Sequence, residues 1–105
     1  MVKVKFLNDK LEKEYLSLLD DDRLKKKINW VIERIKENPN FGQPIAKRLI
    51  PKEYKNERIN NAFWIALSDE SRLIYTIISE DKDEITATIV EWFVRHKDYE
   101  RKFSY

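Results

Sequence analysis

The chain of 105 residues has no cysteine and only one histidine, His96. The lack of thiols excludes disulfides, a catalytic cysteine and cysteine-ligated zinc, and it fits a reducing compartment. A single histidine argues against a His-based transition-metal site, although carboxylates remain able to hold Mg²⁺. We therefore expect no metal and no cofactor.

Long apolar runs are also missing. No stretch approaches the ~20 residues of a membrane helix. The first residues, "MVKVKFLNDK", lack the apolar stretch and the small-residue cleavage site of a signal peptide. We expect a cytoplasmic protein that does not contact membranes.

Several sequence motifs of enzymes are absent as well. The chain has no glycine-rich phosphate loop, no metal-binding histidine pair and no serine motif of the strand-turn-helix type. Its carboxylates cluster in expected turns and on helix faces, which disfavours the paired carboxylates of a glycosidase. What is present is 38% charged residues of nearly balanced sign and 12% aromatic residues. This composition predicts one soluble domain, residues 1–105, with a single core.

Hydrophobic periodicity predicts an α+β fold. Residues 2–7, "VKVKFL", alternate as a strand with one buried face. Two helices should follow as a hairpin, the first capped by Asn8 and the second beginning after Asp20-Asp21-Asp22 and ending at Asn38-Pro39. Residues 40–60 should be mostly loop with one short helical turn. Three strands and a closing helix complete the order β-α-α-β-β-β-α, in the segments 62–68, 72–79, 84–94 and 96–103.

The charges are distributed unevenly along the chain. The cations of residues 41–60 outnumber Glu53 and Glu57, whereas in residues 61–90 only Arg72 and Lys82 oppose six carboxylates. Arg72 is thus the lone cation of its predicted strand. The cations of the loop are Lys47, Arg48, Lys52, Lys55 and Arg58.

Together with the C-terminal residues, these cations suit a phosphodiester. Arginine offers a planar fork for phosphate oxygens and neutralises charge in a transition state. A nearby histidine or tyrosine can exchange a proton or stack on a base, and the 2′-OH of RNA can be the nucleophile. The C-terminal candidates are Arg95, His96, Lys97 and Tyr99.

Each candidate also has a structural interpretation that the sequence leaves open. The loop cations can be ordinary solvated charges, and Arg72 can pair with Glu91 on a neighbouring strand. His96 can cap the last helix. Tyr99 can be a core residue packed on Phe103 at the helical spacing of four.

The order of elements, with "RLIYTII" after a tight hairpin and a terminal "EWFVRHKDYERKF", resembles the RelE/ParE superfamily of toxins from type II toxin-antitoxin systems. The segment "KRLIPKEY" is similar to archaeal members. The resemblance spans nearly the whole chain. It implies an N-terminal strand and helical hairpin packed on a twisted antiparallel sheet, a short C-terminal helix and a concave basic site on the other face.

For function, the resemblance implies a ribosome-dependent mRNA endonuclease that needs no metal, with an antitoxin as partner. Arg72 matches the strand arginine that contacts the scissile phosphate. Arg95 or His96 matches the cation after the last strand, and Tyr99 the tyrosine that stacks or exchanges a proton. The remaining cations would hold the RNA backbone: Lys47, Arg48, Lys52, Lys55, Arg58 and Lys97.

One departure from the family pattern concerns the strand before "RLIY". It reads "AFWIALS" and has no lysine to act as general base, so His96 would have to be the acid or base. The alternatives are a gyrase inhibitor, an inactive antitoxin-binding homologue, or an RNA-binding domain with no toxin role. Whether the free protein is a monomer or a homodimer stays open.

Overall fold

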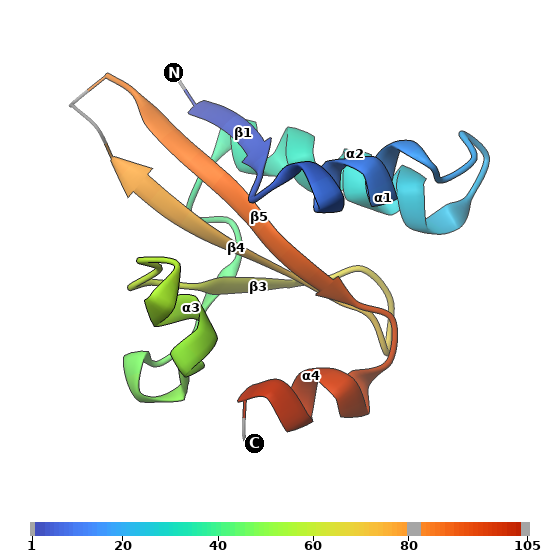
Figure 1. The fold of residues 1–105 in the computed structure, drawn as a ribbon. Helices are drawn as coiled ribbons and strands as arrows, with labels where there is room; N and C mark the ends of the chain where they lie inside the picture. Colours follow the sequence, from blue (N-terminus) through green and yellow to red (C-terminus); the bar gives the residue numbers. More distant parts are fainter. Residues whose placement is uncertain (1, 80–82, 104–105) are drawn as a thin grey trace.

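A computed structural model describes residues 2–79 and 83–103 (Figure 1). The described residues form four α-helices and one five-stranded sheet. This arrangement confirms the predicted α+β class. The elements in chain order are β1 (Val2–Phe6), α1 (Asp9–Leu16), α2 (Arg23–Glu37), β2 (Gln43–Pro44), the 3-10 helix η1 (Lys47–Leu49), α3 (Lys52–Asn56), β3 (Phe63–Ala66), β4 (Arg72–Ser79), β5 (Ile85–Phe93) and α4 (His96–Phe103).

The sheet is mixed, and the expectation of an antiparallel sheet is corrected here. Its strand order is β1-β5-β4-β3-β2. β5 is antiparallel to β4 but parallel to β1, with Val4 opposite Ala87. β1 and β5 are the most distant strands in the sequence, and the helical hairpin carries the chain away from β1 before the sheet resumes. Such a long connection permits parallel neighbours, whereas a tight turn does not.

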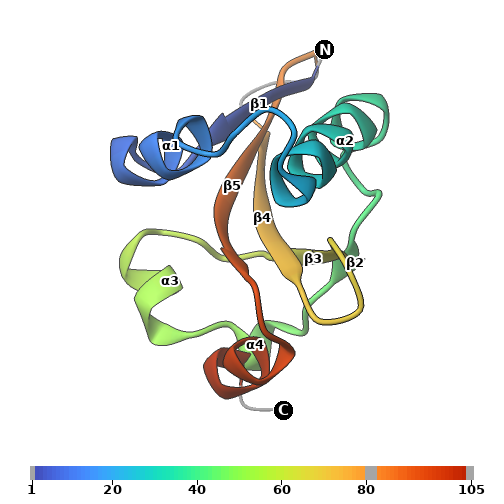
Figure 2. The same cartoon turned by 90° about the vertical axis from the view of Figure 1, so that its right-hand side faces the viewer.

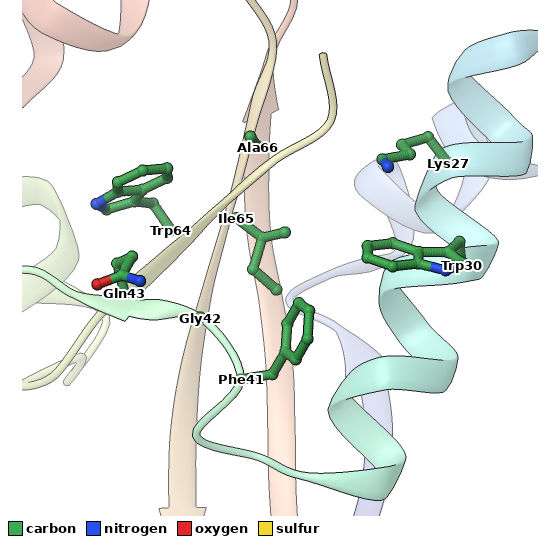
Figure 3. Close-up of a pocket in the computed structure, with 8 residues that line it drawn as sticks. All are labelled: Lys27, Trp30, Phe41, Gly42, Gln43, Trp64, Ile65 and Ala66. Atoms are coloured by element: carbon green, nitrogen blue, oxygen red, sulfur yellow. The ribbon is translucent and has the colours of Figure 1, made fainter. Parts of the chain in front are cut away.

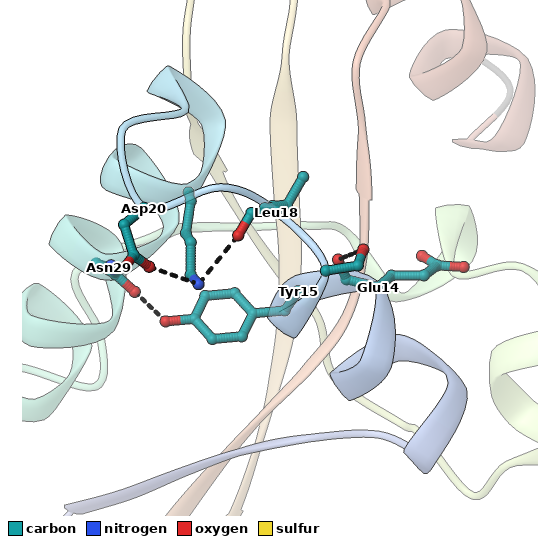
Figure 4. Close-up of polar contacts among 7 residues, drawn as sticks. Glu14, Tyr15, Leu18, Asp20 and Asn29 are labelled. Atoms are coloured by element: carbon teal, nitrogen blue, oxygen red, sulfur yellow. Dashed lines mark hydrogen bonds and ion pairs between the residues drawn. The ribbon is translucent and has the colours of Figure 1, made fainter.

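The helical hairpin forms as predicted. The Asn8 side chain accepts a hydrogen bond from the Leu11 amide at 2.9 Å, and Asp22 accepts one from the Leu24 amide at 2.7 Å. Both are N-caps of the expected kind. The Tyr15 hydroxyl donates to Asn29 across the hairpin (Figure 4).

The segment 40–60 has more structure than the predicted loop with one turn. β2, η1 and α3 all lie within it. Each has only two to five residues, which is too short for a hydrophobic period to be read. Tyr54, Ile45 and Ile50 anchor the segment because their side chains are buried.

The two faces of the sheet carry separate apolar clusters. The α1–α2 hairpin covers one face, where Ile28, Val31 and Ile35 pack with Leu73 and Tyr75. α3 and α4 lie away from the hairpin (Figure 2). They pack on the other face, in the cluster of Ile45, Ile50, Tyr54, Ile59, Ala62, Ile74, Val90, Tyr99 and Phe103. A sheet covered on both faces explains why its strands are apolar throughout.

The single glycine, Gly42, is required by a close approach and not by its backbone angles. Its amide donates to the Tyr75 hydroxyl at 2.9 Å, and that hydroxyl donates to the Pro39 carbonyl at 2.7 Å. A Cβ at position 42 would lie 2.8 Å from Tyr75 Cε1 and 2.9 Å from the hydroxyl oxygen. Tyr75 is fully buried and stacked on Phe63, so it has little room to move.

We therefore expect Gly42→Ala to lower the free energy of unfolding by about 1–3 kcal/mol, the usual cost of overpacking a core. Chemical denaturation measures the change. Asn40→Ala, at an exposed position two residues earlier, is the control and should stay within about 0.5 kcal/mol of the wild type. Equal stability of the two variants would show that Tyr75 can move aside.

Candidate functional site

Arg72, the first residue of β4, is sandwiched between two aromatic rings. Its guanidinium carbon lies 3.9 Å from the ring centroid of Trp64 and 4.5 Å from that of Tyr99. Cation–π contacts of this kind cover the faces of the guanidinium. The N–H groups lie at the edge of the guanidinium plane, which ring contacts on its faces leave uncovered, and this edge can bind phosphate oxygens in pairs.

Local contacts hold the three elements of this stack together. The β3–β4 turn is closed by the Ser68 hydroxyl oxygen, which accepts from the Ser71 amide at 3.1 Å. The Ser71 hydroxyl in turn donates to the Val94 carbonyl at 2.9 Å. Val94 precedes α4, so this bond fixes the beginning of β4 beside the beginning of α4. Arg72 is therefore positioned against Tyr99.

His96 and Glu100 form a pair on the first turns of α4. His96 Nε2 lies 3.2 Å from Glu100 Oε1 at the i,i+4 spacing, and the imidazole stacks on the Tyr99 ring with 5.9 Å between centroids. Nδ1 of His96 is buried with no hydrogen-bond partner among the described residues. The Nε2 edge is thus the one available for proton exchange, and Glu100 orients it.

These side chains line one hollow of about 310 Å³, formed by Trp64, Arg72, His96, Tyr99 and Glu100. His96 and Glu100 are partly exposed, with 40% and 46% of their side-chain surfaces accessible. The hollow thus combines an arginine edge with two groups that can exchange protons. This is the set of groups that a metal-independent phosphodiester reaction uses.

Tyr99 contributes its ring to this site from within the core. It is 0% exposed, and its ring packs on Phe103 at 5.0 Å and on Phe93 at 5.9 Å. The core interpretation of Tyr99 with Phe103 is therefore confirmed. A ring in this position cannot stack on an RNA base, so its role at the site is to support Arg72.

The structural alternative for Arg72, an ion pair with Glu91, is not found. Arg72 stands opposite Phe93 in the sheet, while Glu91 stands opposite Ile74. The carboxylate of Glu91 accepts from the Tyr54 hydroxyl and lies 3.8 Å from Lys102 Nζ. Within residues 2–79 and 83–103, no carboxylate forms an ion pair with Arg72.

Of the two adjacent candidates at the end of β5, His96 lines the hollow and Arg95 does not. Arg95 precedes α4, is exposed, and places Nε 3.3 Å from Asp98 Oδ2. The structure thus separates the two residues that the sequence left undecided. Lys97 is exposed on α4 and also lies outside the lining.

The predicted RNA-binding cations of segment 40–60 do not join the Arg72 hollow. All five are exposed: Lys47 and Arg48 lie on η1, Lys52 and Lys55 on α3, and Arg58 follows α3. Arg58 lines a different hollow, between the loop after α3 and the end of β1. The predicted site residues therefore fall into one compact group and a dispersed set of surface cations.

Two lining residues, Trp64 and Glu100, were not among the predicted site residues. Trp64 stands opposite Ile74, so it is a diagonal neighbour of Arg72 across the β3–β4 pair. Nothing in the sequence distinguished Trp64 from Trp30 and Trp92. Glu100 did carry a signal, because a carboxylate four residues after a histidine on a helix lies on the same side.

A polar network that is partly exposed joins α3, α4 and β5. Tyr54 donates to Glu91, and Lys102 Nζ lies 2.5 Å from Glu53 Oε2. Burial, followed by the negative charge of Glu91, raises the pKa of the Tyr54 phenol well above its ordinary value of 10.0. Burial also raises the pKa of Tyr75.

The raised pKa values predict a loss of stability at alkaline pH. The folded protein holds these phenol protons more tightly than the unfolded chain, so their stabilisation is complete below pH ~10 and falls as pH rises further. In urea titrations above pH ~10, the free energy of unfolding should decline more steeply for the wild type than for Tyr54→Phe, by up to ~1.4 kcal/mol per pH unit. Parallel curves for the two proteins would contradict the shift at Tyr54.

A second aromatic hollow of about 310 Å³ lies between α2 and β3 (Figure 3). The Trp30 and Phe41 rings meet edge to face there, with 5.7 Å between their centroids, and each residue is 41% exposed. Lys27 Nζ lies 4.1 Å from the Trp30 ring centroid. Figure 3 shows the Trp64 ring on the other side of β3, directed away from this pair, while Trp64 still belongs to the lining of this hollow. Trp64 therefore borders both this hollow and the Arg72 hollow.

Within the described residues, no group of three or more His, Asp and Glu side chains is arranged to hold a metal ion. The helices in this part of the chain include none that is long and apolar enough to cross a membrane.

Comparisons with protein-family models, with curated proteins and with solved structures find no significant match to this chain.

Proposed function

We propose that this protein is a toxin of the RelE/ParE type that cuts mRNA on the ribosome without a metal ion. The observation that carries the proposal is the Arg72 guanidinium, held between Trp64 and Tyr99 beside the His96–Glu100 pair. The order of elements, with a helical hairpin on one face of the sheet and α4 on the other, agrees with the resemblance of the sequence.

In the proposed reaction, the 2′-oxygen of the RNA bonds to the adjacent phosphorus and the bond from phosphorus to the 5′-oxygen breaks. Solvent water takes the proton of the 2′-OH, and protonated His96, oriented by Glu100, supplies one to the departing 5′-oxygen through Nε2. The N–H edge of Arg72 neutralises the charge that develops on the non-bridging oxygens. The products are a 2′,3′-cyclic phosphate and a free 5′-OH.

The proposed partners follow from the same assignment. The ribosome would present the mRNA to the Arg72 hollow in the A site. A cognate antitoxin would cover the Arg72 hollow in an extended or helical conformation. We place the protein in the cytoplasm for these reasons.

A second candidate is a non-enzymatic member of the same fold, either a gyrase inhibitor or an inactive antitoxin-binding homologue. Two observations favour it: β3, with the sequence "FWIA", has no lysine, and Tyr99 is buried beneath Arg72. Both features remove groups that could act chemically on RNA. Arg72 would then bind a phosphate without promoting its cleavage.

The two candidates are separated by adding the purified protein to a defined translation system and mapping the mRNA ends by primer extension. The first candidate predicts cuts within the A-site codon and 2′,3′-cyclic phosphate ends. A gyrase supercoiling assay is run in parallel with the same protein. Uncut mRNA together with inhibited supercoiling would select the second candidate.

A further inference from the structure

A further hollow of about 280 Å³ lies where the end of β1 meets the loop after α3. It is separate from the Arg72 hollow, with which it shares no lining residue. On β4 it contains Thr76, four residues beyond Arg72, which corresponds to roughly 13 Å along the strand. The polar residues of its lining are Lys5, Glu57, Arg58, Asn60, Asn61, Thr76 and Thr88.

The floor of this hollow is a polar row across three strands. Lys5 of β1 stands opposite Thr88 of β5, and Thr88 stands opposite Thr76 of β4. Residues paired in this way place their side chains next to one another on one face. The neighbouring residues on this face, Ile74 and Val90, are apolar core residues. The polar row thus interrupts a hydrophobic surface.

Thr88, at the centre of the row, is 3% exposed, and its hydroxyl has no hydrogen-bond partner among the described residues. Thr76 differs, because its hydroxyl donates to Asn61 Oδ1 at 3.0 Å. A buried hydroxyl without a partner destabilises the fold, and valine would fill the same space without that cost. The unpaired hydroxyl is accounted for if a ligand supplies the partner.

The rim of the hollow brings a second cation over this floor. Arg58 has a φ of 62°, the left-handed region that a residue with a side chain rarely adopts. This angle closes α3: the Arg58 amide donates to the Lys55 carbonyl at 2.9 Å and the Ile59 amide to the Tyr54 carbonyl at 2.8 Å, the two bonds of a Schellman helix ending. The helix ending thereby fixes the backbone of Arg58 at the rim of the hollow. Lys5 and Arg58 outnumber Glu57, the carboxylate in the lining.

We propose that this hollow binds a phosphate group through Thr88 Oγ1, the Lys5 ammonium and the Arg58 guanidinium. Two cations around a hydroxyl donor are the groups that phosphate oxygens accept from. The phosphate can belong to a free nucleotide or to the backbone of single-stranded RNA. Only the RNA source rests on the proposed function, where this hollow would hold a backbone phosphate away from the one that is cut.

The test is a two-dimensional NMR titration of the full chain with three ligands: inorganic phosphate, a 5′-mononucleotide and a short single-stranded RNA. The largest changes in chemical shift are expected for the backbone amides of Lys5, Arg58 and Thr88. Thr88→Val should weaken binding about tenfold while its melting temperature stays equal or rises, because the change removes a hydroxyl that is unpaired in the free protein. Lys5→Gln should weaken binding too, and Lys3→Gln, at the other end of β1, should leave it unchanged.

Chemical-shift changes with all three ligands would show that a free phosphate group is sufficient for binding. Changes with RNA alone would show that the ligand is a phosphate of the RNA backbone. Either result supports the site. No localised shift with any ligand, or equal affinity of the wild type and Thr88→Val, would overturn it. A protein that binds phosphate here but leaves ribosomal mRNA uncut would refute the proposed function and retain this site.

Discussion

Replacing Arg72 with lysine is expected to reduce mRNA cleavage on the ribosome by about 10²–10³-fold and to leave the fold intact. Lysine keeps the positive charge but lacks the planar fork, so it cannot lie between Trp64 and Tyr99 and offer two parallel N–H groups. The loss should fall on the rate of the chemical step, because in the proposed reaction the arginine edge acts on charge that develops in the transition state.

The matched control is Arg95→Lys. Arg95 is an exposed arginine near the same end of α4, and its side chain pairs with Asp98 outside the hollow. Cleavage by this variant should stay within about twofold of the wild type, as for a surface substitution. If the two variants lose activity equally, general positive charge is responsible and the aromatic sandwich has no special role.

The second large effect concerns Tyr99. Tyr99→Ala should lower the free energy of unfolding by about 3–5 kcal/mol, because it removes a fully buried ring that packs on Phe93 and Phe103. It also removes one side of the Arg72 stack. We therefore expect loss of both stability and cleavage, measured by thermal unfolding and by primer extension.

Tyr99→Phe distinguishes the ring from the hydroxyl. Phenylalanine retains the stack beneath Arg72, so this variant should fold and keep cleavage within several-fold of the wild type. A folded Tyr99→Phe protein with cleavage reduced by about 10²-fold or more would mean that the tyrosine hydroxyl takes part in proton transfer. That result would contradict the role of Tyr99 as a supporting residue.

Most regular elements could be predicted because their signals are local. Asn8 and Asp22 are capping residues in front of periodic apolar positions, and the structure uses both as N-caps. The closing helix spans residues 96–103, as its pattern predicts. The alternating residues of β1 show partly buried apolar side chains and exposed lysines in turn.

The parts that could not be predicted depend on long-range contacts. The parallel pairing of β1 with β5 joins strands about 80 residues apart, and no local pattern encodes it. Trp64 becomes a site residue only because the β3–β4 register places it diagonally from Arg72.

The choice between Arg95 and His96 depended on where β5 ends. β5 ends at Phe93 and α4 begins at His96, so helical spacing places His96 and Glu100 on one side of the helix. Arg95 lies before this helix and is left outside the hollow. A boundary one residue away would have altered this outcome, and boundaries are the least predictable feature of a sequence.

The central claim is that Arg72, held between two rings, binds the phosphate at which mRNA is cut. The most direct measurement is primer extension on mRNA from a purified translation system, with wild type, Arg72→Lys and Arg95→Lys at equal concentration. The account predicts A-site cuts with 2′,3′-cyclic phosphate ends for the wild type and Arg95→Lys, and a reduction of about 10²–10³-fold for Arg72→Lys. Uncut mRNA with folded wild-type protein, or equal cutting by Arg72→Lys, would contradict it.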